Sequence, residues 1–193
     1  MSYRLIVGLG NPGCEYDQTR HNVGFRVLDT IVAGLARYQD ERGPSQCCKV
    51  GEVRFIKPLT YMNRSGEAVS VWMNWLKYSP SDLLVIVDDV TLPLGQLRFR
   101  QEGTHGGHNG LRSISERLAT DRYARLRCGV GLLPQGVSLE RFVLSRFAKE
   151  EEARVQEMIV AASTAFQCCQ REGIAVAMQV FNTKLKEKSE EKR

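Results

Sequence analysis

The sequence predicts an α/β fold: a single three-layer domain in which a mixed, mostly parallel twisted sheet is flanked by helices. Two observations lead to this class. Short apolar runs typical of strands alternate with segments whose apolar residues recur at helical spacing. One run, residues 83–87, is apolar throughout, as expected of a strand in the middle of a parallel sheet. A chain of 193 residues with 42% hydrophobic content can bury one such core.

The N-terminal part begins with a strand and a helix. Residues 3–9 predict an apolar strand, which ends at the glycine- and proline-rich turn 10–13. The polar run 37–46 is interpreted as a loop, and residues 50–56 as the next strand, which Pro58 ends. Between the turn 10–13 and the polar run 37–46 the sequence predicts a helix, whose apolar face is formed by Val23, Val27, Leu28, Ile31 and Leu35.

The middle of the chain continues the alternation. A second helix is predicted to open near Asn63 and Ser65, either of which could cap it. After the buried strand 83–87, further strands are predicted over residues 97–100 and 125–131. The apolar face of the second helix is formed by Val69, Trp72, Met73 and Leu76.

The C-terminal part is predicted to be helical. Residues 138–172 form a helical lid or flank that includes a long helix over 148–171. We expect one α/β hydrolase domain over residues 1–183, followed by a charged, frayed tail over 184–193. No stretch approaches the ~20 apolar residues of a membrane span, and residues 1–10 lack the apolar region of a signal peptide.

The six cysteines give no metal or disulfide pattern. They include two adjacent pairs, and no C-x-x-C occurs. Adjacent cysteines do not match zinc-ligand spacing, so we interpret all six as reduced structural residues of a cytoplasmic protein.

The string His105–Gly110 (HGGHNG) is a poor core segment and a poor strand. Its glycines suggest positive φ or the close approach of a ligand. Helical spacing resumes just after it, so the turn is expected to present free N–H groups at a helix start, a ready anion site. Residues 98–127 carry seven arginines and three acids, a net charge of +4 within a chain of +5. The natural partner is a polyphosphate or a nucleic acid.

The segment Gly8–Gly13 matches G-x-G-x-x-G after a strand, which is a weak signal for a dinucleotide site. Pro12 has no N–H to offer a pyrophosphate, and no second strand ends in an acid about 20 residues later. A purely structural tight turn is the alternative interpretation.

Several polar side chains fall at junctions between strands and the elements that follow them. In α/β sheets such positions lie at the carboxyl edge, where ligands bind. A histidine backed by a carboxylate can take a proton from water, and carboxamides can hold the carbonyl or its oxyanion. No G-x-S-x-G marks a covalent nucleophile, and the spacing of the three histidines fits no zinc template. These residues therefore suggest ester cleavage by water: Asn11, His21, Asn63, Asp88 and Asn109.

Together these motifs resemble the bacterial-type peptidyl-tRNA hydrolases along about residues 3–182. The shared features include LIVGLGNPGxxY followed by TRHNxG, the KPLTYMNRSG segment and GGHNGL. Several motifs in one order are far more specific than any one of them. The matching segments are 5–24, 57–66, 87–95, 106–111, 126–131 and 142–147.

The resemblance implies a monomeric cytoplasmic esterase that needs no metal and no organic cofactor. Its substrate would be peptidyl-tRNA, cleaved at the ester to the 3′ ribose. By matching positions, His21 would be the general base and Asp88 its orienting partner. Asn11 and Asn63 would position the water and the carbonyl. The implied substrate and tRNA contacts are Tyr16, Met62, Asn63, His108, Asn109, Arg98, Arg100 and Arg127.

The chain departs from the family pattern at a few positions. Thr91 stands where an acid is common, Val87 where His or Tyr is common, and Arg64 is bulkier than expected. Loop 132–140 is short, which could alter a substrate-gating lid. The alternative hypothesis is a binding protein rather than an enzyme: a non-catalytic RNA-binding relative. RNA binding alone does not require the set of histidine, aspartate and asparagines.

Overall fold

Seven strands of the described residues, 2–40 and 43–182, form one sheet with the order β2-β3-β4-β1-β5-β7-β6 in the computed structural model. The four central strands β4, β1, β5 and β7 are parallel, whereas β2 and β3 at one edge and β6 at the other are antiparallel to their neighbours. The strands are β1 (Leu5–Gly8), β2 (Gln39–Asp40), β3 (Ser45–Val50), β4 (Val53–Pro58), β5 (Leu83–Asp89), β6 (Leu97–Arg100) and β7 (Ala124–Gly129).

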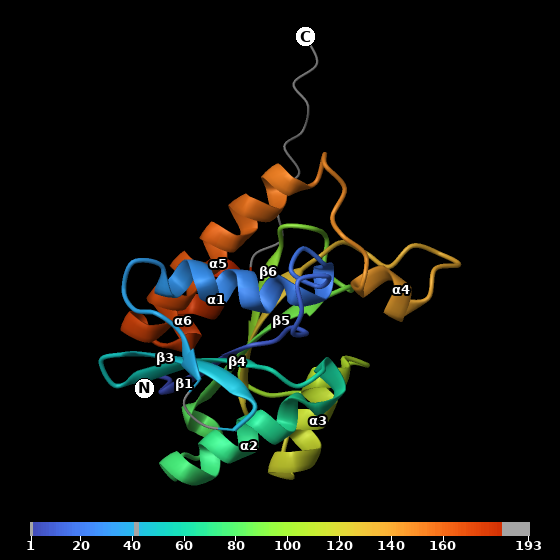
Figure 1. Ribbon diagram of the computed structural model, residues 1–193. Helices are drawn as coiled ribbons and strands as arrows, with labels where there is room; N and C mark the ends of the chain where they lie inside the picture. The colour runs from blue at the N-terminus through green and yellow to red at the C-terminus, as the bar shows by residue number, and fades with distance from the viewer. Residues whose placement is uncertain (1, 41–42, 183–193) are drawn as a thin grey trace.

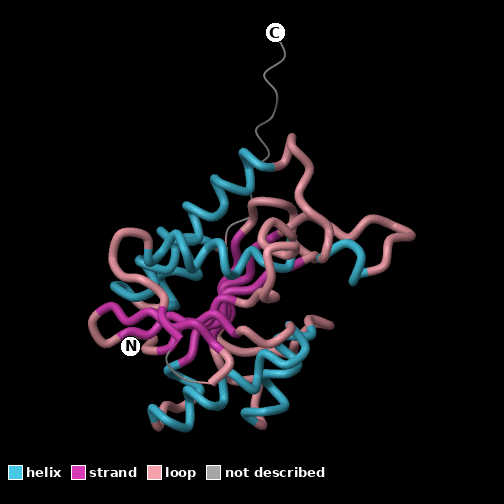
Figure 2. Tube along the Cα trace, viewed as in Figure 1, coloured by secondary structure: helices cyan, strands magenta, loops and turns pink. Residues whose placement is uncertain are grey.

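Helices cover both faces of the sheet, so the fold has the three predicted layers (Figures 1 and 2). α1, α5 and α6 lie on one face, and α2 and α3 lie on the other. The helices are α1 (Val23–Val32), α2 (Ser65–Leu76), α3 (Asn109–Leu118), α4 (Leu139–Val143), α5 (Glu152–Glu172) and α6 (Ile174–Phe181). Three short 3-10 helices are η1 (Arg20–Asn22), η2 (Met62–Arg64) and η3 (Pro80–Asp82).

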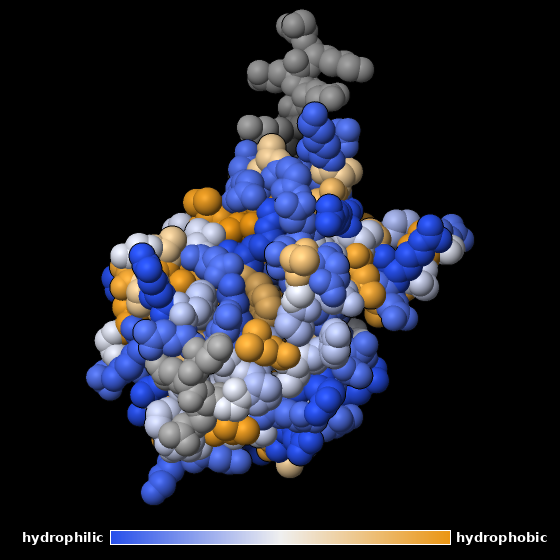
Figure 3. All heavy atoms as spheres, in the orientation of Figure 1, coloured by the Kyte–Doolittle hydropathy of each residue, from blue (hydrophilic) through white to orange (hydrophobic). Residues whose placement is uncertain are grey.

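The central strand β1 divides the core into two halves. Ile6 packs with α1 and α5 on one face, while Leu5 and Val7 pack with α2 and α3 on the other. Every residue of β1 and of β5 is buried, which explains why both strands are almost continuous apolar runs. The face shown in Figure 3 is mostly hydrophilic, with apolar side chains in small separate patches. The apolar residues of the sequence therefore serve mainly this two-sided core.

Three local predictions differ from the structure. The run interpreted as a loop over 37–46 contains β2 and the start of β3. The strand predicted over 50–56 is present as β4 and ends at Pro58, but it begins only at Val53, because residue 50 ends β3 and residues 51–52 form the turn between the two strands. The signal was weak because β3 uses Cys47 and Cys48 on opposite faces where aliphatic residues are usual. Leu35 does not extend the first helix: α1 ends at Val32, and Leu35 is 63% exposed.

The glycines of the G-x-G-x-x-G match are explained by packing. A Cβ on Gly8 would meet the carbonyl oxygen of Gly24 at 2.5 Å, and a Cβ on Gly10 would meet the ring of Phe25 at 2.7 Å. Gly24 in turn has no room for a Cβ against Leu9 and the Ile86 carbonyl oxygen. The start of helix α1 therefore packs directly against the backbone after β1 and against the backbone of β5. These contacts support the interpretation of Gly8–Gly13 as a purely structural tight turn.

The predicted C-terminal lid or flank divides into two parts. α5 packs against α1 and α6 in the core, whereas the segment carrying α4 stands out from the body of the molecule (Figure 1). The proposed domain end at residue 183 and the tail 184–193 lie outside the described residues. Within the described part of the chain, no helix combines the length and apolar character needed to cross a membrane.

Candidate active site

A cavity of about 560 Å³ opens at the carboxyl ends of the central strands. Its walls come from the segments after β1 and β4, the end of β5, the start of α3, and α4. The predicted site residues that line it are Asn11, Tyr16, His21, Met62, Asn63, Asp88, His108, Asn109 and Arg127. Residues far apart in the sequence thus meet at the sheet edge that the strand pattern indicated. Of the predicted residues, Arg98 and Arg100 do not line the cavity.

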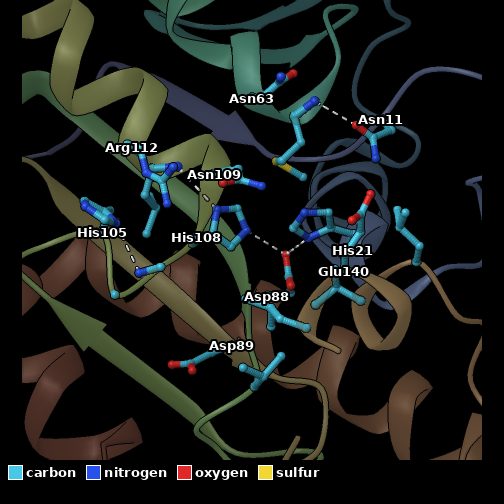
Figure 4. Close-up of a pocket in the computed structure, with 18 of the residues that line it drawn as sticks. Asn11, His21, Asn63, Asp88, Asp89, His105, His108, Asn109, Arg112 and Glu140 are labelled. Atoms are coloured by element: carbon cyan, nitrogen blue, oxygen red, sulfur yellow. Dashed lines mark hydrogen bonds and ion pairs between the residues drawn. The ribbon is translucent and has the colours of Figure 1, made fainter. Parts of the chain in front are cut away.

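His21 and Asp88 form the centre of the cavity (Figure 4). Nδ1 of His21 lies 2.9 Å from Oδ1 of Asp88, and both side chains are buried. Asp88 is the penultimate residue of β5. His21 lies in η1, and the nearby Gly24 packs closely against the Ile86 backbone, which holds η1 over β5. An ionised carboxylate only accepts hydrogen bonds, so the proton belongs on Nδ1 and Nε2 of His21 is left as the basic nitrogen.

His108 is a second partner of Asp88. Its Nε2 lies 3.0 Å from the same Oδ1 atom that binds His21. Its Nδ1 accepts from the backbone N–H groups of Gly110 and Leu111, at 3.1 and 3.3 Å, and so caps α3. Because Nδ1 is an acceptor, the proton of His108 is on Nε2, which donates to Asp88. The capping contacts therefore fix the tautomer of His108, and Asp88 receives two N–H donors.

The prediction of an anion site at the start of α3 is wrong, because the cap made by His108 occupies N–H groups of this helix start. The N–H groups of Gly110 and Leu111 are occupied by His108 and are not free for a phosphate. The predicted caps of α2 are also wrong: neither Asn63 nor Ser65 caps it, and Ser65 Oγ donates to the Met62 carbonyl oxygen instead. Asn63 is left to line the cavity.

The charges of the pair set its protonation. Burial alone would lower the pKa of His21, but the negative charge of Asp88 and the hydrogen bond to it prevail and raise that pKa above its ordinary value. Burial opposes ionisation of Asp88 as well. The two histidines and their hydrogen bonds nevertheless hold the pKa of the Asp88 carboxyl well below its usual range.

His21, Asp88 and His108 offer ligand atoms within 4.8 Å of one another, a spacing that a metal ion could use. Coordination by Nε2 of His108 requires that nitrogen to be free of its proton. Since Nδ1 already accepts from the α3 backbone, the ring would then lose both protons or the helix would lose its cap. The three side chains therefore suit a carboxylate held by two N–H donors better than a cation.

Asn11 is held by two neighbours. Its Oδ1 accepts from the Met62 N–H at 2.7 Å. Asn22 clamps its backbone, accepting from the Asn11 N–H and donating to the Asn11 carbonyl oxygen, each at 2.9 Å. With Oδ1 engaged, Asn11 presents its Nδ2 donor to the cavity, beside His21 in Figure 4. The segments after β1 and β4 are thereby tied together around His21.

Four arginines share one face of the outer strands. Arg98 lies opposite Arg127 and Arg100 lies opposite Arg125 in the antiparallel β6–β7 pair. Arg127 forms an ion pair of 2.6 Å with Asp89, and Arg125 is buried against backbone carbonyl oxygens. Like charges placed directly across strands repel, so the accessible Arg98 and Arg100 form a surface suited to a polyanion.

The sequence alone does not identify three further candidate functional residues, which are Asn22, Arg112 and Glu140. Asn22 belongs to the segment that contains His21, but nothing in the sequence shows that its carboxamide clamps Asn11. Arg112 and Glu140 line the cavity from α3 and α4. Helical spacing from Leu111 could have indicated that Arg112 faces the glycine-rich loop. The direction of Glu140 depends on how the α4 segment folds back, which no periodicity predicts.

The cap made by His108 can be tested by stability. Both His108→Ala and His108→Asn lose the bond to Asp88, but asparagine is a good N-cap and alanine is not. We expect His108→Asn to be more stable than His108→Ala by about 1 kcal/mol in urea-induced unfolding. Equal stability of the two variants would show that Nδ1 of His108 does not cap α3.

Comparisons with known proteins agree on one family. Residues 5–191 match the family model described as Peptidyl-tRNA hydrolase. A peptidyl-tRNA hydrolase of Methylacidiphilum infernorum is 47% identical over 178 residues, covering 91% of this chain and 96% of that protein. A peptidyl-tRNA hydrolase of Synechococcus sp. (strain JA-3-3Ab) is 43% identical over 189 residues, covering 94% of this chain and 84% of that protein. The fold is similar to that of the Acinetobacter baumannii peptidyl-tRNA hydrolase, with a TM-score of 0.83, 31% identity, and 94% and 95% of the two chains covered.

Proposed function

Because the chain belongs to the peptidyl-tRNA hydrolase family, we propose that it hydrolyses the ester between a peptide and the 3′ ribose of tRNA with water activated by His21. This reaction recycles tRNA from peptidyl-tRNA that was released prematurely. The observation that carries the mechanism is the 2.9 Å contact between Nδ1 of His21 and Asp88, which leaves Nε2 as the base in the cavity.

The reaction needs only water and side chains. Nε2 of His21 removes a proton from water, and the water oxygen bonds to the ester carbonyl carbon. Asp88 stabilises the imidazolium that forms, with its charge already held in place by His108. When the tetrahedral intermediate breaks, the bond between the carbonyl carbon and the ribose 3′ oxygen is cleaved. The imidazolium returns its proton to that oxygen, which yields a free peptide and a free 3′ hydroxyl.

The carboxamides around His21 suit the carbonyl and its oxyanion. Asn11 offers a donor whose direction is fixed by Met62 and Asn22. Asn63 and Asn109 lie in the same cavity and are assigned to the substrate. Donors that are fixed before the substrate arrives stabilise developing negative charge without reorganisation during the reaction. Tyr16, Met62 and His108 complete the lining, His108 chiefly by holding Asp88.

The tRNA is proposed to lie across Arg98 and Arg100 on β6, with Arg127 between them and the cavity. Arg127 is the member of this group that both lines the cavity and belongs to the basic strand pair. Phosphate groups on this face would relieve the repulsion between arginines that lie opposite one another across the two strands. The same contacts would guide the acceptor stem so that its 3′ end reaches His21.

The basic face predicts a measurable salt dependence. Arg98→Ala or Arg100→Ala should weaken tRNA binding and lower the slope of log K against log salt by about one unit each, if each arginine meets one phosphate. Arg117→Ala is the matched control, since that arginine pairs with Glu67 on the side of α2 and α3. Slopes that stay at the wild-type value in both β6 variants would place the RNA on another surface.

Turnover of N-acetylated aminoacyl-tRNA by the purified protein tests the proposal directly. We expect catalytic release of free tRNA, and slower cleavage of aminoacyl-tRNA whose α-amine is free and cationic. Binding of tRNA without turnover would instead favour the non-catalytic RNA-binding alternative. A dinucleotide oxidoreductase would be stabilised by NAD(P), an effect that we do not expect.

We also propose that the protein works as a monomer in the cytoplasm. All residues of the proposed catalytic centre come from one chain, so a second copy is not needed to complete it. Four of the six cysteines, Cys47, Cys48, Cys128 and Cys169, are buried in the core, and thiols that serve packing suit a reducing compartment.

A further inference from the structure

Two charged side chains in the cavity wall have no partner among the described residues. The acids of the lining are Asp88, Asp89 and Glu140, and the arginines are Arg112 and Arg127. Asp88 is bound by two histidines, and Asp89 pairs with Arg127. Glu140 and Arg112 remain, and no hydrogen bond or ion pair between described residues engages either side chain. Both are exposed to solvent.

These two charges lie at opposite ends of the site. Figure 4 shows Arg112 beyond His108 and Glu140 beyond His21, with Asp88 between the two histidines. Arg112 extends from α3, and Glu140 lies in the first turn of α4, the short helix that stands out from the body. A substrate that spans the catalytic pair therefore meets an unpaired cation on one side and an unpaired anion on the other.

The polarity of the cavity would orient the proposed substrate. The RNA part carries a negative charge on every phosphate, so it is attracted by Arg112 and repelled by Glu140. The acyl group is attached to the last ribose and must extend past His21, away from the phosphates. It therefore reaches the wall formed by α4. The side chain of the amino acid next to the ester is the part of the acyl group whose charge varies from one substrate to another.

We propose that Glu140 is a specificity-determining residue that favours peptidyl-tRNA whose esterified residue has a cationic side chain and disfavours one with an acidic side chain. The proposal rests on the proposed function and assigns a substrate preference to it. A lysine ammonium stands on a flexible four-carbon stem, so it can reach an exposed carboxylate at the cavity rim. The α-nitrogen has no such reach and stays beside the carboxamides around His21. Recognition of the side chain by Glu140 is thus separate from recognition of the acylated α-amine.

The test compares two esters of the same tRNA, N-acetyl-lysyl and N-acetyl-norleucyl, so that the RNA contribution cancels. For the wild type, kcat/KM should favour the lysyl ester by about two- to fivefold at low salt, the range of an exposed charge pair. The preference should shrink as salt screens the pair. Glu140→Gln should bring the ratio to about one, and Glu140→Lys should favour N-acetyl-glutamyl over N-acetyl-glutaminyl ester. Glu157→Gln is the matched control, an exposed acid on α5 whose loss should leave the ratio unchanged.

The ratio does not depend on how much of a variant is folded, which keeps the test valid for weakened proteins. A wild-type ratio near one, or a ratio that Glu140→Gln leaves at the wild-type value, would overturn the assignment of Glu140 while leaving the proposed function intact. If the wild type cleaves none of the esters, the proposed function fails first, and the substrate preference fails with it.

Discussion

His21→Ala should lower kcat for N-acetylated aminoacyl-tRNA by about 100-fold or more while leaving the Kd for tRNA near the wild-type value. The imidazole is the group whose unprotonated Nε2 faces the cavity, and its removal leaves no base beside the attacking water. The tRNA contacts that we propose lie on β6 and β7, so affinity for the RNA should survive. Single-turnover hydrolysis and a filter-binding titration separate the two quantities.

His105→Ala is the matched control for this variant. His105 also lines the cavity, but among the described residues its ring accepts one hydrogen bond, from the Gly107 N–H, and forms none with Asp88. We expect its loss to change kcat far less than the loss of His21. Wild-type turnover by His21→Ala would remove this histidine from the mechanism, and a large rise in the Kd for tRNA would give it a binding role.

Asp88→Asn should lower kcat by up to about 10,000-fold, the loss that the equivalent change causes in a serine protease triad. The carboxamide is close in shape to the carboxylate but carries no charge. It can therefore neither stabilise the imidazolium nor keep His21 in the tautomer that leaves Nε2 basic.

The pH profile gives Asp88→Asn a second readout. In the wild type the pKa of His21 is raised, so the acid limb of kcat/KM should lie above the ordinary histidine value of about 6.5. Without the charge of Asp88, burial prevails and lowers the pKa of His21, so the acid limb should move to lower pH. A reduced rate with an unmoved acid limb would mean that Asp88 serves the fold rather than the base.

The layers of the fold and the meeting of the site residues could be predicted because they follow from strong patterns. β1 and residues 83–87 of β5 are apolar on both faces, and polar residues come at or just after the ends of these strands, at the edge where α/β sheets bind ligands. The hairpin of β3 and β4 was missed because cysteines and a short turn interrupt the alternation that marks a strand.

Within the site, the sequence indicated residue types but not their partners. The family motif predicts that His108 contacts the substrate, but it does not reveal that the ring also joins the α3 backbone to Asp88. That role depends on the backbone direction after Gly107, which is in the left-handed region with φ of 84°. Asn22 is important because it binds the loop after β1, and Glu140 because α4 brings it to the cavity wall. Local spacing carries no information about such contacts.

The central claim is that His21 carries its proton on Nδ1, facing Asp88, and keeps Nε2 free as the base. A long-range ¹H–¹⁵N NMR titration of the histidine rings measures both the tautomer and the pKa. We predict the Nδ1–H tautomer at neutral pH and a pKa above 6.5 that coincides with the acid limb of kcat/KM. A ring with its proton on Nε2, or one whose titration does not match the activity profile, would contradict the account.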